Sequence, residues 1–304
     1  MNSGGATAEC PTRRWIALTE HGWPPTLLVM NKSKFVRDGV VIAYHDSAPD
    51  NREKPVVLLL HGFPDRAEMW SAQVTFLVAR GFRVLAPDLR GYGDSAIAPR
   101  TADYHWSEVL GDLLGLLDHL GVAQADVVGH DWGAAIAWLL AGRYPARVRR
   151  LVVISVGHPM AYARAGLGQK LRSWYILYFM LAGLAERLLR LPFFPGFRSV
   201  FRSHPDADEV MARMRAPGRW RAALRLYRAN LLSMLLGQHP KARADTLGIH
   251  SRDDRYLVAS QMIRSERWVH GRWRYVGLPG GHWIPLEQPD ALNALLAEHL
   301  GVAG

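Results

Sequence analysis

The sequence contains little cysteine and no long apolar run. The first shortage excludes a disulfide-rich protein, and the second argues against a membrane-spanning one. Cys10 is the single cysteine among 304 residues, which excludes a disulfide framework within one chain and is typical of a reducing compartment. The longest apolar run, residues 174–185, is shorter than the roughly 20 residues that span a bilayer. Residues 1–15 lack the charged start and apolar core of a signal peptide. We therefore expect a soluble, cytoplasmic protein without a transmembrane segment.

Acidic residues are scarce in one part of the chain. The formal net charge is +10, and between Pro159 and Arg243 there are 15 Lys or Arg residues against four acidic ones, so this segment carries essentially the whole excess. No nucleic-acid-binding motif accompanies the excess, so we expect no nucleic-acid partner. One interpretation is a solvated helical surface in an arginine-rich protein. The other is a basic rim that attracts an anionic substrate or holds this segment near acidic lipid.

Short apolar runs alternate with helical patterns through the first half of the chain. Four runs are continuously apolar, as expected of strands in a sheet covered on both faces: residues 56–60, 82–87, 125–129 and 151–156. Helical patterns at about 68–80, 104–120 and 132–143 lie between them. Later, strand patterns at 246–250 and 273–278 flank a helical pattern at 257–268, and a last helix begins near Pro289. This alternation predicts an α/β fold with a mostly parallel, doubly wound sheet.

The alternation is interrupted between residues 159 and 243, where the pattern is helical and rich in aromatic and arginine residues. A helical block between two sheet strands predicts a lid over the carboxyl edge of the sheet, where ligands bind in such folds. We therefore divide the chain into an α/β core, residues 34–158 and 244–304, and a helical cap, residues 159–243. Residues 1–33 have no clear pattern and are interpreted as an N-terminal extension, disordered in part.

The segment GHDWG, residues 129–133, joins an apolar run to an Ala-rich helical pattern. Small residues two positions before and after a central side chain are typical of a nucleophile elbow, a strained turn between strand and helix. The N-terminus of the helix that follows would keep the Asp131 carboxylate ionised. The alternative is an ordinary helix N-cap, because aspartate is favoured at that position.

An acid and a histidine follow two later predicted strands. Asp254 comes after the strand at 246–250, and His282 lies in a Gly-rich loop after the last strand. The order nucleophile, acid, histidine is that of the α/β-hydrolase triad. Asp253 adjoins Asp254 and is the alternative acid.

A fourth motif, HGFP at residues 61–64, ends the first apolar run. It turns the chain back over the sheet edge, so the backbone N–H groups of Phe63 and Trp132 are expected to form an oxyanion hole. The similar letters HGWP at residues 21–24 follow no apolar strand, and we assign them no function.

Together these motifs resemble the epoxide hydrolase branch of the α/β-hydrolase superfamily. The segments concerned are HGFPD (61–65), DLRGYGDS (88–95), GHDWGA (129–134) and GGHWIPLEQP (280–289), and the similarity runs from about Phe35 to the C-terminus. The resemblance implies an α/β-hydrolase fold with an inserted lid and an enzyme that uses no cofactor and no metal. It is less specific for the substrate.

A carboxylate nucleophile suits displacement at an sp³ carbon. Asp131 would form an alkyl ester with an epoxide or an alkyl halide, and water activated by His282 would attack the ester carbonyl, with Asp254 orienting the imidazole. Epoxide opening needs a proton donor, for which tyrosine is suited. The resemblance places these donors at Tyr175 and Tyr227, with Tyr178 as the alternative to Tyr175. The alternative is that the aromatic and apolar residues within 175–182, which have helical spacing, only pack one face of a helix into the core.

Aromatic residues near the motifs and in the cap predict a pocket for a small hydrophobic epoxide and water: Phe63, Trp132, Trp174, Tyr178, Phe179 and Trp283. A haloalkane dehalogenase is the alternative enzyme, although Phe63 stands where such enzymes carry a second halide-binding N–H donor. A catalytically silent ligand-binding protein is the alternative of another class, and the intact Asp131, His282 and Asp254 set argues against it. Whether the protein forms a homodimer is left open.

Overall fold

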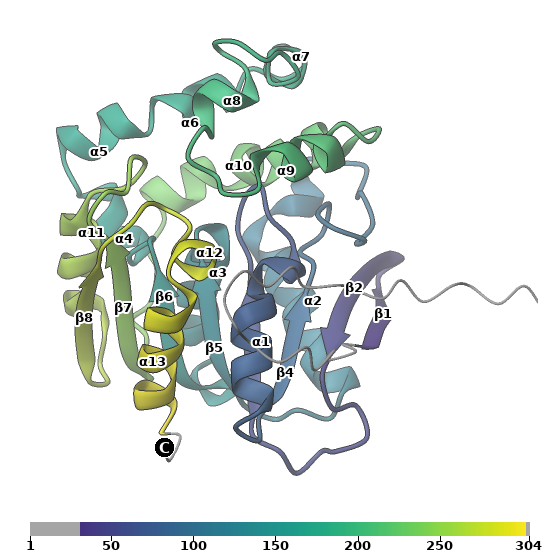
Figure 1. Ribbon diagram of the computed structural model, residues 1–304, viewed down its shortest axis with the longest axis vertical. Coiled ribbons are helices and arrows are strands. Elements are labelled where there is room, and N and C mark those ends of the chain that lie inside the picture. Colours follow the sequence, from purple (N-terminus) through teal and green to yellow (C-terminus); the bar gives the residue numbers. More distant parts are fainter. Residues whose placement is uncertain (1–30, 302–304) are drawn as a thin grey trace, which may run out of the picture.

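The computed structural model describes residues 31–301, which form one eight-stranded sheet with helices on both faces and further helices above one edge (Figure 1). The strands lie in the order β1-β2-β4-β3-β5-β6-β7-β8. Their bounds are β1 Asn31–Arg37, β2 Val40–Asp46, β3 Val56–Leu60, β4 Arg83–Pro87, β5 Ala125–His130, β6 Val148–Ile154, β7 Asp245–Ser251 and β8 Trp273–Leu278. β1 pairs antiparallel with β2, and β2 with β4, whereas all other neighbours pair in parallel. The predicted α/β fold is confirmed.

The central strands are buried along their whole length, which explains their continuously apolar sequences. Every residue of β3, β4 and β5 is buried. Apolar side chains therefore point to both faces of the sheet, and helices on both sides must cover them. The strand pair β1–β2 was not predicted. It begins at Asn31, inside the segment that we interpreted as an extension, and residues 1–30, with the motif at 21–24, lie outside the described residues.

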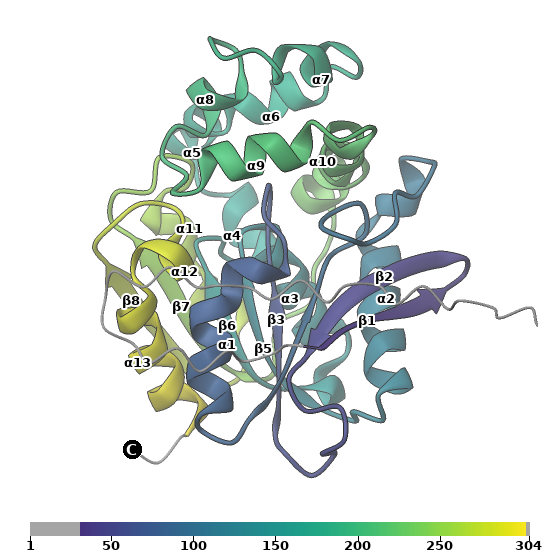
Figure 2. The same cartoon turned by 45° about the vertical axis from the view of Figure 1, so that its right-hand side comes forward.

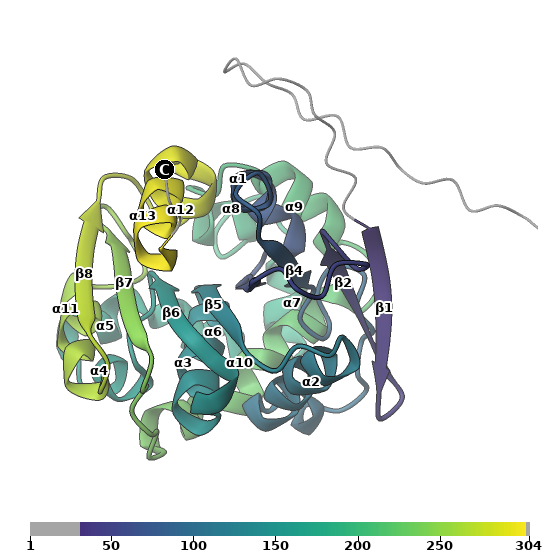
Figure 3. The same cartoon turned by 90° about the horizontal axis from the view of Figure 1, so that it is seen from below.

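Two layers of helices cover the sheet (Figure 3). On one face lie α1 (Ser71–Val78), α12 (Ile284–Glu287) and α13 (Pro289–Leu300), and on the other α2 (Trp106–His119), α3 (Trp132–Arg143) and α11 (Ala259–Ile263). Each face has its own apolar core, with Leu77 and Leu296 in one and Leu113 and Trp138 in the other. The helix predicted at 257–268 is shorter than expected, because it changes into the 3₁₀ helix η4 (Arg264–Trp268) after Ile263. Three further 3₁₀ segments are η1 (Ala67–Trp70), η2 (Ala102–Tyr104) and η3 (Pro145–Arg147).

Seven helices between β6 and β7 lie above the carboxyl ends of the parallel strands (Figures 1 and 2). They are α4 Pro159–Ala163, α5 Leu167–Arg172, α6 Trp174–Phe179, α7 Leu184–Leu188, α8 Phe197–Val200, α9 Ala207–Met214 and α10 Arg219–Leu236. We call residues 159–236 the lid. All of these helices fall inside the segment predicted as a cap. Within residues 31–301, no helix combines the length and hydropathy needed to cross a bilayer.

Candidate active site

The ends of four parallel strands bring the predicted catalytic groups together beneath the lid. Phe63 follows β3, Asp131 follows β5, Asp254 follows β7 and His282 follows β8. Because carboxyl ends of parallel strands meet at one sheet edge, side chains separated by up to 219 positions in the sequence become neighbours there.

The turn at Asp131 has the strained backbone expected of a nucleophile elbow. Asp131 has a φ of 52°, which places a non-glycine residue in the left-handed region. A Cβ added to Gly129 would collide with backbone atoms across the turn, one added to Gly133 would collide with the backbone at the end of β3, and one added to Gly62 would collide with Asp131 itself. The Asp131 side chain makes no capping hydrogen bond to α3, although the residue occupies the N-cap position. Its carboxylate is thus presented to the site rather than used by the helix.

The Asp131 carboxylate is held between a backbone donor and the histidine. Its Oδ1 accepts a 2.8 Å hydrogen bond from the Phe63 N–H, and its Oδ2 lies 3.6 Å from His282 Nε2. The side chain is 13% exposed, so the carboxylate is still reachable. Two backbone N–H groups were predicted to form the oxyanion hole. The N–H of Phe63 donates to the Asp131 carboxylate, whereas among the described residues the N–H of Trp132 makes no hydrogen bond to it. Trp132 is the first residue of α3.

The structure brings Asp254, and not Asp253, to the histidine. Asp254 Oδ2 accepts a 2.8 Å hydrogen bond from His282 Nδ1, and its Oδ1 accepts bonds from the N–H groups of Tyr256 and Leu257 at 2.8 and 3.0 Å. Asp254 is buried, whereas the side chain of Asp253 is exposed to solvent. With Nδ1 donating to Asp254, Nε2 of His282 is directed at Asp131.

Two carboxylates keep the imidazole protonated. Burial alone would lower the pKa of His282, but the charge of Asp254, the hydrogen bond to Asp254 and the nearby Asp131 carboxylate raise it to about 10. Burial alone would raise the pKa of Asp254, but the charge of His282 and hydrogen bonds from His282 and Tyr256 hold it below its ordinary value. At neutral pH the site is therefore an imidazolium between two carboxylates.

Tyr175 and Tyr227 are buried lid residues, and both rings pack against Phe179, which lies beside Phe63. The phenol of each has a pKa well above its ordinary value, first because it is buried and also because the negative charge of Asp131 disfavours a second anion nearby. The Tyr227 ring packs edge-on against Phe63 and Trp132, with centroids 5.3 and 5.0 Å apart. Both phenols are therefore neutral at physiological pH and able to donate a proton or hydrogen bond.

The other predicted aromatics divide into two groups. Phe179 is at the site, because its ring lies 5.5 Å from Phe63 and 5.1 Å from Tyr227. Tyr178 points elsewhere: its hydroxyl donates to the Ala185 carbonyl within the lid at 3.3 Å, and its pKa, raised to about 12 mainly by burial, is also affected by Glu186 but not by Asp131. Trp174 is 44% exposed on the outside of the lid.

Trp283 is fully buried and belongs to a contact between the lid and the core. Its indole N–H donates to Asp65 Oδ2 at 3.0 Å, and Asp65 Oδ1 lies 3.0 Å from Nε2 of His204, a lid residue. The hydrogen bond and charge of His204 lower the pKa of Asp65 despite its burial, which by itself would raise it. The Trp283 ring also packs edge-on against the His282 ring, with centroids 4.9 Å apart, so Trp283 supports the loop that carries His282.

Sequence reasoning missed several residues around the triad. Phe201, from the lid, lies 5.2 Å from the Phe63 ring, and Tyr256 lies 5.1 Å from the His282 ring. His130 Nε2 and Ser155 Oγ both bond the backbone carbonyl of His282, at 2.9 and 3.2 Å. The sequence offered a signal for His130, which lies inside the elbow, and for Asp65 of the Trp283 contact, which ends the HGFPD motif. Phe201 and Tyr256 have no such local signal.

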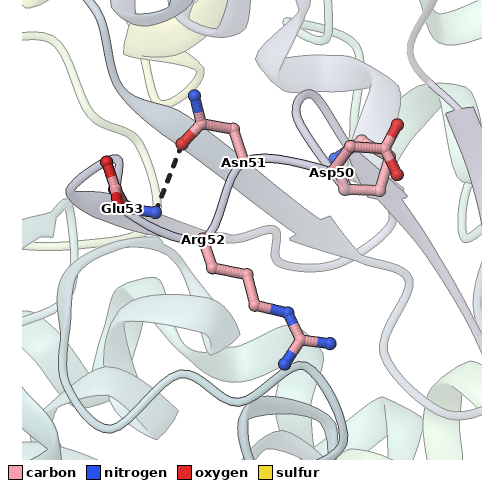
Figure 4. Close-up of a pocket in the computed structure, with 5 residues that line it drawn as sticks. Asp50, Asn51, Arg52 and Glu53 are labelled. Carbon is pink, nitrogen blue, oxygen red and sulfur yellow. Dashed lines mark hydrogen bonds between the residues drawn. The ribbon is translucent and has the colours of Figure 1, made fainter.

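Other features of the surface do not resemble a reaction centre. A hollow lined by residues 49–53 lies in the loop between β2 and β3, where the Glu53 N–H donates to Asn51 Oδ1 at 3.2 Å (Figure 4). This loop precedes β3 and therefore lies at the sheet edge opposite to Asp131. Within residues 31–301, no group of three or more His, Cys, Asp or Glu side chains is arranged to hold a metal ion.

Comparison with known proteins agrees with this geometry. Residues 55–289 match the family described as alpha/beta hydrolase fold. Epoxide hydrolase 3 of Xenopus tropicalis is 30% identical over 279 residues, covering 85% of this chain and 75% of that protein. The chain belongs to the α/β-hydrolase fold family, in its epoxide hydrolase branch. Epoxide hydrolase 4 of Mus musculus, another member of this branch, is 29% identical over 84% of this chain and 75% of its own.

A solved structure from the epoxide hydrolase branch has the same architecture. Epoxide Hydrolase A from Mycobacterium thermoresistibile superposes with a TM-score of 0.76 at 28% sequence identity, over 90% of this chain and 98% of that one. The likeness extends over the lid as well as the sheet, because the lid and both halves of the sheet are needed to reach that coverage. The chain is a hydrolase of this branch.

Proposed function

We propose that the protein hydrolyses a hydrophobic epoxide to a vicinal diol through a covalent ester on Asp131. The observation that carries the proposal is the position of the Asp131 carboxylate, which lies 3.6 Å from His282 Nε2 and accepts a hydrogen bond from the Phe63 N–H, beneath a lid that buries Tyr175 and Tyr227. A carboxylate can displace an oxygen from an sp³ carbon, but the alkoxide that leaves needs a proton. Tyr175 and Tyr227 supply that proton from the side of the lid.

In the first step, an Asp131 oxygen bonds to one ring carbon and the C–O bond of the epoxide breaks. The electron pair goes to the epoxide oxygen, which takes a proton from a tyrosine hydroxyl. Ester formation removes the negative charge of Asp131, and with it one of the two charges that raise the pKa of His282. The imidazolium can then return a proton to the tyrosinate and become the base for the second step.

In the second step, His282 takes a proton from water while the water oxygen attacks the carbonyl carbon of the ester. The Phe63 N–H, which bonds Asp131 Oδ1 at 2.8 Å, would stabilise the developing oxyanion. The tetrahedral intermediate expels the diol oxygen, which is protonated by the imidazolium. The carboxyl proton then returns to His282, so the carboxylate and the imidazolium are both regenerated.

The aromatic side chains around Asp131 favour an epoxide over an alkyl halide. Halide release needs N–H donors, and Trp132 supplies one indole while Phe63 has none. The lid instead buries two phenols near the site, Tyr227 with its ring against Phe63 and Trp132, which suits an oxygen leaving group. Haloalkane dehalogenation is therefore the less suited reaction.

A single turnover in H₂¹⁸O tests the proposal. With styrene oxide in less than one equivalent, the label should enter the Asp131 carboxylate, and the diol should carry one oxygen from the protein. Mass spectrometry of the peptide containing Asp131 reads this out. Asp254→Ala should abolish turnover, whereas Asp253→Ala, its exposed neighbour, should not. Label found only in the diol would mean direct attack by water, and halide release from 1-chlorobutane without epoxide turnover would favour the dehalogenase.

A further inference from the structure

The outer surface of the lid carries a row of exposed apolar side chains. Residues 167–184 expose one large apolar residue at every third or fourth position, each between 44% and 70% exposed: Leu167, Leu171, Trp174, Leu177, Leu181 and Leu184. Phe193 and Phe194, just after α7, are 61% and 67% exposed. Helix α7 lies in the part of the lid furthest from the sheet, and α5 and α6 lead up to it (Figures 1 and 2). We call these eight residues the apolar row.

The apolar row is not required by packing within the chain. The inward side of the same helices is already buried through Tyr175, Phe179, Ala185 and Leu189. Single exposed leucines are ordinary on protein surfaces, but a continuous row of large apolar side chains marks an interaction site. Within α5 and α6 the spacing of three and four residues puts the exposed side chains on one face of each helix, and the row continues over the turn after α6 to the start of α7.

The charges around the apolar row have one sign. From residue 159 to residue 198 every exposed charged side chain is a cation: Arg164, Lys170, Arg172, Arg187, Arg190 and Arg198. The only acid in this stretch, Glu186, is buried and bonded to Arg228 at 2.6 Å. Within the described residues, Lys170, Arg187 and Arg190 form no ion pair. Three cations beside the row thus lack a counterion.

We propose that this face of the lid docks on an anionic lipid surface. The leucine and aromatic side chains would enter the boundary between headgroups and acyl chains, while the Lys and Arg side chains would reach the phosphates around them. A second copy of the chain fits less well, because pairing two such faces would bring their uncompensated cations together. The protein would then lie on the membrane with its lid downward.

The direct test is binding of the intact protein to vesicles. Vesicles of phosphatidylcholine alone should bind little protein, and vesicles containing an equal amount of phosphatidylglycerol should bind it in a salt-sensitive manner, measured by co-sedimentation. Salt should weaken binding because headgroup attraction falls off within a Debye length. The readout needs no substrate, so failure here leaves the proposed hydrolysis untouched.

Two sets of variants separate this face from the rest of the lid. Lys170→Gln, Arg187→Gln and Arg190→Gln together should lower the partition coefficient on the order of 100-fold, at about fivefold per cation. Arg215→Gln, Arg221→Gln and Lys241→Gln are the matched control, since these exposed cations lie outside residues 164–198. Leu177→Ser with Leu181→Ser should likewise weaken binding at least tenfold, roughly, from the apolar area lost. Its control is Leu232→Ser with Leu236→Ser, two similarly exposed leucines of α10.

The proposal is overturned if the wild-type protein does not bind anionic vesicles or binds both kinds of vesicle equally. It is also overturned if the control variants lose as much binding as the test variants. Sedimentation velocity gives the competing outcome. A dimer that dissociates in the Leu177→Ser, Leu181→Ser variant, without vesicle binding by the wild type, would assign the face to a second copy of the chain.

Discussion

At the scale of single residues, the chemistry depends on how Asp131 and His282 share charge. The two side chains are 3.6 Å apart, and Asp254 holds the other side of the imidazole at 2.8 Å. A histidine with a pKa of about 10 is a poor base at neutral pH. It becomes a useful base when one carboxylate loses its charge, which is what ester formation on Asp131 would do.

The first prediction therefore concerns the pKa of His282. Asp131→Asn has the shape of the aspartate without its charge and imitates the neutral ester. We expect the pKa of His282 to fall from about 10 by one to three units, roughly, because a charge 3.6 Å away is removed. NMR titration of the imidazole in both proteins measures this, and an equal pKa in the two would show that Asp131 does not control the histidine.

A second prediction concerns the lid tyrosines. Tyr227→Phe and Tyr175→Phe each remove only a hydroxyl, so packing should survive while formation of the ester slows. One general acid is typically worth about 10²–10⁴-fold, with less lost in either single variant if the other tyrosine compensates. Tyr178→Phe is the matched control, because its hydroxyl bonds Ala185 instead. Rapid-quench measurement of ester formation should rank the double variant slowest and leave Tyr178→Phe close to wild type.

At the scale of elements, the lid is joined to the core close to the loop that carries His282. Asp65 follows β3, His204 lies between α8 and α9, and Trp283 adjoins His282. The Asp65 carboxylate accepts a bond from each of the other two side chains and is 4% exposed. A buried carboxylate with two such partners contributes both to the position of the lid and to the shape of the His282 loop.

Asp65→Asn should therefore destabilise the fold more than loss of a surface ion pair. We expect the free energy of unfolding to fall by about 1.5–3 kcal/mol, because one charge-assisted bond to a buried group is lost. Asp94→Asn, which removes the exposed partner of Lys32, should cost less than about 1 kcal/mol. Urea denaturation of the three proteins compares them; equal losses in the two variants would contradict a special role for the Asp65 contact.

At the scale of the whole molecule, folding lowers the pKa of some buried histidines and raises that of another. Together these shifts limit the pH range in which the fold is stable. Burial lowers the pKa of His130 to about 4 and that of His158 to about 3. Below pH 6.5 these groups take up protons in the unfolded chain but not in the folded one, so stability is lost as the pH falls towards 4. His282, with its pKa raised to about 10, stabilises fully below pH 6.5, and this contribution is lost as the pH rises towards 10.

The fourth prediction is a stability maximum near neutral pH. Between pH 6.5 and pH 5, His158 alone should account for about 2 kcal/mol, at about 1.4 kcal/mol per pH unit. His158→Asn should accordingly flatten the acid side of the profile, even if its stability at pH 7 is lower. Denaturation curves at pH 5, 6 and 7 provide the comparison, and an unchanged slope in the variant would exclude His158 as a cause.

Much of the architecture could be predicted from the chain because its signals are local. Continuously apolar runs predicted β3 to β6, and the glycines around Asp131 predicted the turn. Both signals depend only on residues that are neighbours in the chain. β1 was missed because it carries no continuously apolar run and its side chains at 32–37 alternate between exposed and half-buried. β2 was missed although its first five residues, 40–44, are apolar. The helix expected up to Trp268 ended at Ile263, because tertiary contacts override a weak local pattern.

The sequence by itself determined the family, the sheet and the order of Asp131, Asp254 and His282 along it, because short motifs and strand ends specify these. Only the tertiary structure decided which neighbouring acid reaches the histidine and which lid aromatics pack near the site. Tyr175 and Tyr178 lie three residues apart on α6, but the Tyr175 ring packs against Phe201 and Tyr256, whereas the Tyr178 hydroxyl bonds the Ala185 carbonyl. Phe201 and Tyr256 are far from Tyr175 in the chain, so no local pattern encodes these contacts.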